Sequence, residues 1–274
     1  LLTQYGDKKV GCKLSPTGDF EGVDSLLNWE MASTQKVPRK VLDQMQSPDL
    51  VVVRAAHKEM LLSDVLDLIH TASQRTNHKV HAYIEYMSTT NLKELLAQLL
   101  PTTVLPTPID TLLQDGKPYL WLGDGNTVGK LHFDPFDNLL VQLAGSKTFR
   151  LADPSRNERF LEGHMREAEL ETIGEVVPRL RNLQAHTLNV SLPPVRFLKH
   201  KLTESTSMVH SPIDLMNLTK SAERYPTAAE ITFMDCTVHA GEAIFVPSFY
   251  WHEVTSSPSN PTTYPLQDWT LSDT

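Results

Sequence analysis

Runs of apolar and β-branched residues, each ended by a turn signal, recur through the first third of the chain. The runs are short, as is typical of strands, and they leave room between them for two helices with apolar faces. Strands are expected at residues 9–14, 50–53 and 80–86, and helices at residues 63–69, capped by Ser63 and Asp64, and at residues 91–100, capped by Asn91 and ended by Pro101.

From Tyr119 onward the pattern becomes one short strand after another. The turn sequence Ala144-Gly145-Ser146-Lys147 lies between two apolar segments and predicts a hairpin. Strands are expected at residues 119–122, 128–134, 139–143, 148–151, 236–239, 243–247 and 252–255. This spacing is typical of a double sheet of the jelly-roll kind, so the chain is predicted to be mainly β with flanking helices.

A long insert interrupts the strands over residues 155–230, and we expect some helix around residues 166–170. We interpret residues 118–274, insert included, as the β-rich core, and residues 1–117 as a mixed α/β flank packed on that core. The two parts are expected to act as a single functional domain, since 274 residues suffice for one large β-rich unit.

Composition narrows the class of protein. A formal net charge of −8 disfavours a nucleic-acid partner, because phosphates attract positive surfaces. The two cysteines cannot form a disulfide framework, and no apolar run is long enough to span a membrane. We therefore expect a cytoplasmic protein, with the nucleus as a second location, that acts on a protein, a peptide or a small molecule. Since the chain begins at Leu1 rather than methionine, the native start is expected to lie upstream.

The candidate chemistry lies around His132 and Asp134. These residues are two apart in a predicted strand, so both side chains project from the same face. An imidazole and a carboxylate so placed form two-thirds of the 2-His-1-carboxylate triad that binds non-haem Fe(II). His252, in a later strand, is the candidate for the third ligand. The plainer alternatives are a polar pair at a strand edge and a hydrogen-bonded core histidine.

Two further polar residues extend this candidate site. Lys147 begins the strand that follows the predicted turn, and its ammonium suits one end of a dicarboxylate whose other end chelates a metal. Asn138 lies four residues after Asp134, where its amide is able to donate to the chelating end. A solvated turn lysine is the plainer reading of Lys147. Together these positions describe a site for Fe(II) and 2-oxoglutarate.

These motifs, with the stretch from Gly241 to His252, resemble the JmjC (cupin-8) Fe(II)/2-oxoglutarate oxygenases, and most closely the small branch that includes the lysyl (3S)-hydroxylases. The resemblance implies a double-stranded β-helix fold. It also implies that His132, Asp134 and His252 are the catalytic metal ligands, and that Lys147, Asn138 and Tyr83 bind the co-substrate. Tyr83 stands where the family often has a tyrosine that contacts 2-oxoglutarate, although a packing role is equally compatible with its position.

The same resemblance implies a reaction. Fe(II) as cofactor, 2-oxoglutarate as co-substrate and O2 would hydroxylate a protein side chain, lysine by resemblance alone, with release of succinate and CO2. The expected partners are a protein or peptide substrate and a second copy of the chain in a homodimer. The alternatives are an RNA-modifying hydroxylase of the same family, a catalytically inactive binding module, and a metal-dependent isomerase of the cupin type.

Two positions depart from the family pattern. Gly129 stands three residues before the first ligand, where the family commonly has threonine or serine that helps to hold 2-oxoglutarate. After the His252 block, the family has a strand of Val-Asn-Phe-Trp type, whereas residues 258–265 here are rich in proline and are predicted to be coil. The last strand of the barrel is therefore expected to be missing or displaced, or the barrel to close in a different way, which is the reason for considering an inactive module.

Overall fold

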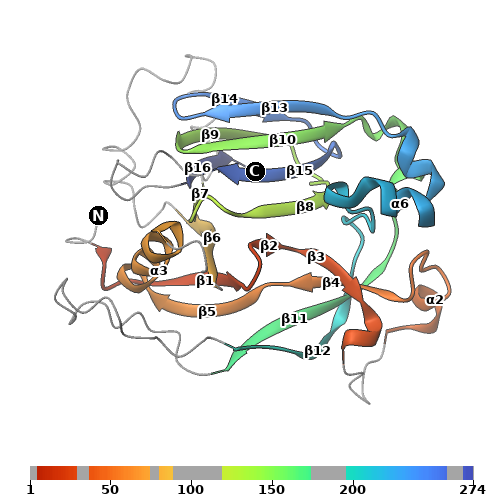
Figure 1. The fold of residues 1–274 in the computed structure, drawn as a ribbon, viewed down its shortest axis with the longest axis horizontal. Coiled ribbons are helices and arrows are strands. Elements are labelled where there is room, and N and C mark those ends of the chain that lie inside the picture. Colours follow the sequence, from red (N-terminus) through yellow and green to blue (C-terminus); the bar gives the residue numbers. More distant parts are fainter. Residues whose placement is uncertain are drawn as a thin grey trace.

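The computed structural model describes residues 5–29, 37–74, 80–88, 119–173, 196–257 and 268–273. These residues form mostly strands, arranged in three sheets, so the prediction of a mainly β protein with few helices is confirmed (Figure 1). The helical segments are η1 Leu26–Asn28, α2 Arg39–Leu42, α3 Leu62–Gln74, η3 Pro154–Phe160, η5 Leu215–Asn217, α6 Leu218–Arg224 and η6 Pro226–Glu230. No helix among the described residues has both the length and the apolar character needed to cross a bilayer.

Two of the sheets form the jelly-roll core. Their strands are β1 Lys9–Ser15, β2 Asp19–Phe20, β5 Ala56–Leu61, β6 His81–Ser88, β7 Tyr119–Gly123, β8 Val128–His132, β9 Asn138–Ala144, β10 Ser146–Ala152, β13 Met234–His239, β14 Ala243–Val246, β15 Trp251–Ser257 and β16 Asp268–Asp273. The larger sheet has the order β14, β9, β16, β7, β6, β1, β5, and the smaller has the order β13, β10, β15, β8, β2. Phe149 and Leu151 of the smaller sheet pack with Val246 of the larger one, so the two sheets face each other.

The predicted hairpin between β9 and β10 is wrong. These strands are consecutive and joined at Gly145, which has a φ of 74°, but they belong to different sheets. Strand β9 pairs with β14 and β16, whereas β10 pairs with β13 and β15. A glycine turn indicates that the chain reverses its direction, but not which sheet the next strand joins. Here the turn carries the chain from one sheet to the facing sheet, and apolar side chains of both strands pack between the two sheets.

Part of the N-terminal third is built into the larger sheet. Strand β1 pairs with β5 and β6, and β6 pairs with β7. Helix α3 covers this end of the sheet, where Val65 and Ile69 are fully buried at helical spacing (Figure 1). The helix predicted at residues 91–100 lies outside the described residues. The division into a flank at residues 1–117 and a core at residues 118–274 stays a prediction.

A third, four-stranded sheet has the order β12, β11, β4, β3. Its strands are β3 Gly22–Ser25, β4 Leu50–Arg54, β11 Met165–Ile173 and β12 Arg196–Ser207. The helix expected around residues 166–170 is wrong, because these residues belong to β11, which pairs in parallel with β4 and antiparallel with β12. Here long-range strand pairing overrides local helix propensity.

The last strand of the barrel is displaced along the sequence rather than missing. The proline-rich residues 258–265 lie outside the described residues, but β16 follows them. It lies in the middle of the larger sheet, paired with β7 on one side and β9 on the other. The sheet is therefore continuous across this position, and the reason for expecting an inactive module is removed.

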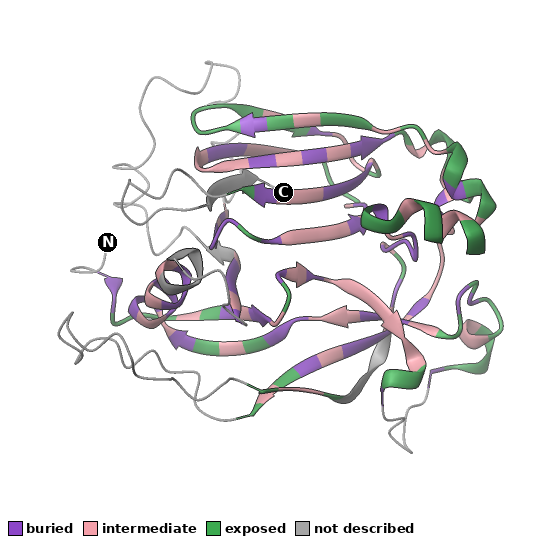
Figure 2. Ribbon diagram, viewed as in Figure 1, coloured by how far each residue is buried: buried purple, intermediate pink, exposed green. Residues whose placement is uncertain are grey.

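The buried side chains form separate clusters. Buried and more exposed residues alternate along many of the strands (Figure 2). The largest cluster lies between β1, β5, β6, β7 and α3 and includes Leu14, Ile84 and Leu122. A second cluster surrounds Trp251, whose indole stacks on Phe160 with ring centroids 4.7 Å apart. The second cluster includes Leu131 of β8 and Trp251 of β15, so it packs the two strands that carry His132 and His252.

Replacing Leu122 with alanine should lower the free energy of unfolding by about 2–5 kcal/mol, because a fully buried side chain would leave a cavity in the largest cluster. Leu27, which is 94% exposed, is the matched control, and Leu27→Ala should change that free energy by less than about 0.5 kcal/mol. Urea denaturation of both variants measures the difference. Equal effects would contradict the burial described above.

Candidate metal centre

Two histidines meet across a pair of antiparallel strands. His132 on β8 lies directly opposite His252 on β15, and their ring centroids are 4.3 Å apart. Directly opposed residues project from the same face of a sheet, so the pairing register itself brings the two rings together. Asp134 completes the group: one ligand-type atom from each of the three residues lies within 4.8 Å of the others.

Each histidine is oriented by a hydrogen bond to the main chain. Nδ1 of His132 donates to the carbonyl of Lys130 at 2.6 Å, and Nδ1 of His252 donates to that of Tyr250 at 2.8 Å. These bonds leave Nε2 of each ring as the acceptor that a metal requires. Burial, followed by the neighbouring His132, lowers the pKa of His252 to about 4, against the influence of Asp134. The His252 imidazole is therefore neutral at pH 7.

Asp134 is held by a loop rather than by a strand. Strand β8 ends at His132, so the predicted strand over residues 128–134 is two residues too long. The main-chain carbonyl of Asp134 accepts a hydrogen bond from the Phe249 amide at 2.7 Å, and the Asn138 side chain donates to its Oδ2 at 2.9 Å. Oδ2 lies 3.7 Å from Nε2 of His252. Asn138 therefore orients the candidate carboxylate ligand.

Lys147 and Tyr83 form the second part of the site. Along β10 the residues Lys147, Phe149 and Leu151 alternate toward the interior, so the lysine occupies an inward position of an otherwise apolar face. Lys147 is 4% exposed, and its ammonium donates to the Tyr83 hydroxyl at 2.9 Å. Lys147 is therefore buried inside the barrel, and it is not a solvated turn residue.

One cavity of about 350 Å³ joins both parts. Its lining includes every residue named above for the metal and the co-substrate, namely His132, Asp134, His252, Asn138, Lys147 and Tyr83. Gly129 also lines the cavity, so this position lacks the threonine or serine hydroxyl that the family commonly has there. The buried hydroxyls of Thr127 and Ser256, hydrogen-bonded to each other at 2.9 Å, line the same cavity. Sequence reasoning missed both because they do not occupy a position of the family motif.

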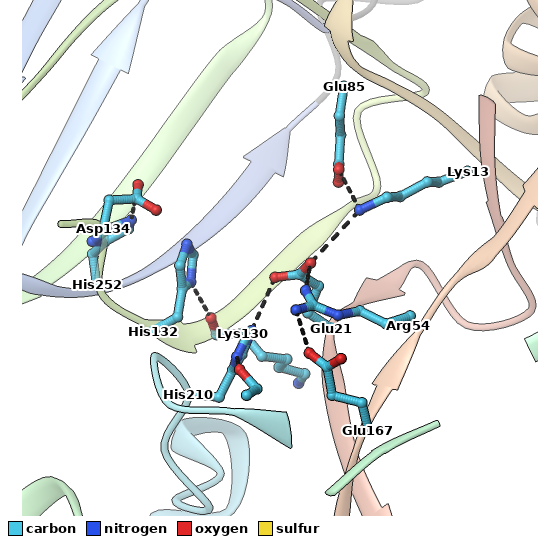
Figure 3. Close-up of polar contacts among 11 residues, drawn as sticks. Lys13, Glu21, Arg54, Glu85, Lys130, His132, Asp134, Glu167, His210 and His252 are labelled. Carbon is cyan, nitrogen blue, oxygen red and sulfur yellow. Dashed lines mark hydrogen bonds and ion pairs between the residues drawn. The ribbon is translucent and has the colours of Figure 1, made fainter. Parts of the chain in front are cut away.

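A buried histidine beside the triad was also missed. His210 lines the cavity and stacks on the His132 ring with centroids 5.7 Å apart. Its Nδ1 contacts the Ser207 hydroxyl at 2.6 Å. Its Nε2 contacts Glu21 at 2.9 Å (Figure 3). Both nitrogens are thus committed, and His210 supports the neighbouring ring. No local motif marks it, since it reaches the site only through the bridge of its segment to β8.

The donor set fits a divalent transition metal. Two imidazoles and one carboxylate match the 2-His-1-carboxylate ligand set typical of non-haem Fe(II) sites, and hydrogen bonds to the other ring nitrogens and to the carboxylate supply the usual supporting shell. His132, Asp134 and His252 would hold the ion. The buried ammonium of Lys147 in the same cavity suits an anionic co-substrate.

The fold is that of a cupin. A family model described as a cupin-like domain matches residues 2–269, so the chain belongs to this family. The resemblance to JmjC (cupin-8) proteins drawn from the sequence is confirmed at that level.

Curated relatives carry JmjC names. The chain is 28% identical over 206 residues to the human "Bifunctional peptidase and (3S)-lysyl hydroxylase JMJD7", covering 74% of this chain and 57% of that protein. It is 26% identical over 217 residues to "JmjC domain-containing protein F" of Dictyostelium discoideum (73% and 40%). It is 28% identical over 136 residues to "Lysine-specific demethylase JMJ30" of Arabidopsis thaliana (50% and 22%). The matched part therefore spans between about one fifth and three fifths of these relatives.

Asn138→Ala should weaken metal binding by about ten- to hundredfold, because Asp134 would lose the side chain that orients it. Titration with Co(II), followed by visible absorbance, measures the affinity. Asn28→Ala is the control, since Asn28 bonds to Asp24 on the surface and should leave the affinity unchanged. Equal affinities for Asn138→Ala and the unmodified chain would exclude this role.

Proposed function

We propose that this chain is an Fe(II)- and 2-oxoglutarate-dependent oxygenase that hydroxylates a protein side chain, with lysine as the target. The observation that carries the proposal is the single cavity that contains both the His132, Asp134 and His252 group and the Lys147–Tyr83 pair. A metal alone would need only His132, Asp134 and His252. An acidic co-substrate that binds the metal at one end would account for the Lys147–Tyr83 pair.

Fe(II) would supply the oxidative chemistry when bound: 2-oxoglutarate and O2 become succinate and CO2, and one oxygen atom enters a substrate C–H bond. The chain's own residues bind and orient the reactants. His132, Asp134 and His252 would hold the ion on one side and leave its other side to the co-substrate and O2. Asn138 uses one N–H to orient Asp134, and its contact with the co-substrate stays a prediction.

Lys147 and Tyr83 would receive the distal carboxylate of 2-oxoglutarate. The ammonium is almost completely buried, so a carboxylate inside the cavity is a better partner for it than water. Tyr83 already accepts from Lys147 and would add its hydroxyl as a second donor. Leu140, Phe149 and Val246 line the same cavity and exclude water from it.

Lysine is proposed as the target because the names of both the human and the Arabidopsis relatives refer to lysine. A polypeptide substrate and a cytoplasmic location belong to the same proposal, and the homodimer stays a prediction. The net charge of −8 continues to disfavour the RNA-modifying alternative.

The proposal predicts that the purified protein converts 2-oxoglutarate to succinate slowly in the presence of Fe(II) and O2. His132→Ala should abolish this turnover, because it removes a ligand. His57→Ala, which alters an exposed histidine on β5, should retain the turnover. Mass spectrometry of the succinate produced by the unmodified protein and by both variants measures this turnover. Turnover that survives His132→Ala would exclude the assignment, and failure to bind both Fe(II) and 2-oxoglutarate would favour the inactive module.

Lys147→Ala should raise the KM for 2-oxoglutarate by about ten- to hundredfold, the range expected for losing a charge-assisted hydrogen bond. The dissociation constant for the metal should change far less, because Lys147 contacts the co-substrate and not the ion. Lys40→Ala, at an exposed position, is the control. An unchanged KM in Lys147→Ala would remove this residue from the co-substrate site.

A further inference from the structure

Two buried hydroxyls lie in the wall of the cavity that the smaller sheet forms. Thr127 directly precedes β8 and is 3% exposed, and Ser256 lies on β15 and is 5% exposed. The Thr127 hydroxyl donates to the Ser256 oxygen at 2.9 Å. Burying a hydroxyl costs free energy unless it forms hydrogen bonds, so polar residues in such a wall call for an explanation. Neither residue belongs to the metal-ligand group.

The strand register places Ser256 beside Lys147. In the smaller sheet β15 lies between β10 and β8 (Figure 1). Ser256 lies directly opposite Lys147 of β10, and on its other side its amide donates to the Thr127 carbonyl at 2.8 Å. Directly opposed residues of antiparallel strands project from the same face, with Cβ atoms about 4.5–5.5 Å apart. The three side chains therefore form a row of one ammonium and two hydroxyls.

This row lies on the same face of β15 as the metal site. His252, Val254 and Ser256 alternate along the strand, and all three line the cavity. A ligand that extends from the metal ligands toward Lys147 would therefore run along β15 and meet Ser256 at the lysine end.

Gly129 leaves space in the same wall. It lies opposite Val254, and a Cβ atom added to it would have no heavy atom beyond its chain neighbours closer than 3.9 Å. Packing therefore does not exclude a side chain here, yet this position provides no hydroxyl. Among the described residues that line the cavity, hydroxyls occur at Tyr83, Thr127 and Ser256. Tyr83 belongs to the larger sheet, so the hydroxyls of this wall are those of Thr127 and Ser256.

A carboxylate beside Lys147 would accept hydrogen bonds as well as pair with the ammonium. Its two oxygens offer about four acceptor positions, which the ammonium and the Tyr83 hydroxyl do not fill. Ser256 accepts from Thr127, so its own hydroxyl hydrogen is directed away from Thr127. Hydrogen bonds to an ionised acceptor are about twice as strong as those between neutral groups, so such a contact would contribute to affinity.

We propose that Ser256 binds the distal carboxylate of the acidic co-substrate beside Lys147, and that Thr127 is a positioning residue that orients the Ser256 hydroxyl. The pair would supply the hydroxyl contact that Gly129 does not provide. This inference rests on the proposed function, since it requires a co-substrate with a carboxylate remote from the metal. It goes further by assigning two residues outside the family motif to recognition of that carboxylate.

The test compares two probes that share the metal-chelating 2-oxo acid group: 2-oxoglutarate, and 2-oxopentanoate, which has a methyl group in place of the distal carboxylate. Isothermal titration calorimetry in the presence of Mn(II) measures the dissociation constant for 2-oxoglutarate directly and that for 2-oxopentanoate by competition. Ser256→Ala should raise the first constant by at least about tenfold, the loss expected for a hydrogen bond to a charged group, and change the second by less than about twofold. An unchanged first constant, or an equal rise in both, would overturn the proposal.

Ser257→Ala is the matched control, because this neighbouring residue of β15 is exposed and projects from the opposite face. It should leave both dissociation constants unchanged. A change in the 2-oxoglutarate constant as large as that in Ser256→Ala would overturn the proposal.

Thr127 is tested by a pair of variants. Thr127→Val should weaken 2-oxoglutarate binding by about threefold or more without affecting 2-oxopentanoate, whereas Thr127→Ser, which keeps the hydroxyl, should retain the affinity of the unmodified protein. Thermal unfolding shows whether each variant folds, and the Thr127 pair decides the question if Ser256→Ala does not. Equal 2-oxoglutarate affinities for the two Thr127 variants would overturn the proposal.

A failure of the proposed function gives a different result. If the unmodified protein with Mn(II) binds neither probe, or binds both equally, the cavity does not recognise a distal carboxylate, and the proposed co-substrate is excluded together with this inference. If the unmodified protein prefers 2-oxoglutarate and Ser256→Ala keeps the full preference, only this inference is overturned.

Discussion

His132 and His252 lie opposite each other on neighbouring antiparallel strands, and this pairing holds two ring nitrogens at one point. Strand side chains alternate between faces, so a slip of one residue between β8 and β15 would turn one ring away from the other. Trp251, fully buried beside His252, and Leu131, buried beside His132, oppose such a slip because both would lose their places in the core. Core packing thus fixes the geometry of the candidate site.

The space between the sheets holds a site rather than a continuous apolar core. Inward positions that would ordinarily carry apolar residues carry Lys147 on β10 and Lys13 and Glu85 on β1 and β6. Lys147 is almost completely buried, and Lys13 and Glu85 are partly buried, so these ionic groups lose hydration energy that ion pairing offsets only in part. Under the proposed function, binding of a metal and an acidic co-substrate would give this cost a functional reason.

Features encoded locally were predictable, and features set by distant contacts were not. The strand patterns, the His132–Asp134 spacing and the inward Lys147 are readable because each depends on a few neighbouring residues. The hairpin at Gly145 was wrong because sheet membership depends on the packing of two layers. Residues 166–170 form a strand because β4, far away in the sequence, pairs with them. His210 was missed for the same reason, since only the folded chain places it beside the triad.

The most direct test of this account is a crystal structure of the protein grown without oxygen in the presence of Mn(II) and 2-oxoglutarate, with anomalous scattering used to locate the metal. The account predicts one strong anomalous peak bound by Nε2 of His132, Nε2 of His252 and the Asp134 carboxylate. It also predicts that 2-oxoglutarate extends from the ion to Lys147. A metal bound elsewhere with these three side chains unoccupied, or a co-substrate carboxylate directed away from Lys147, would contradict it.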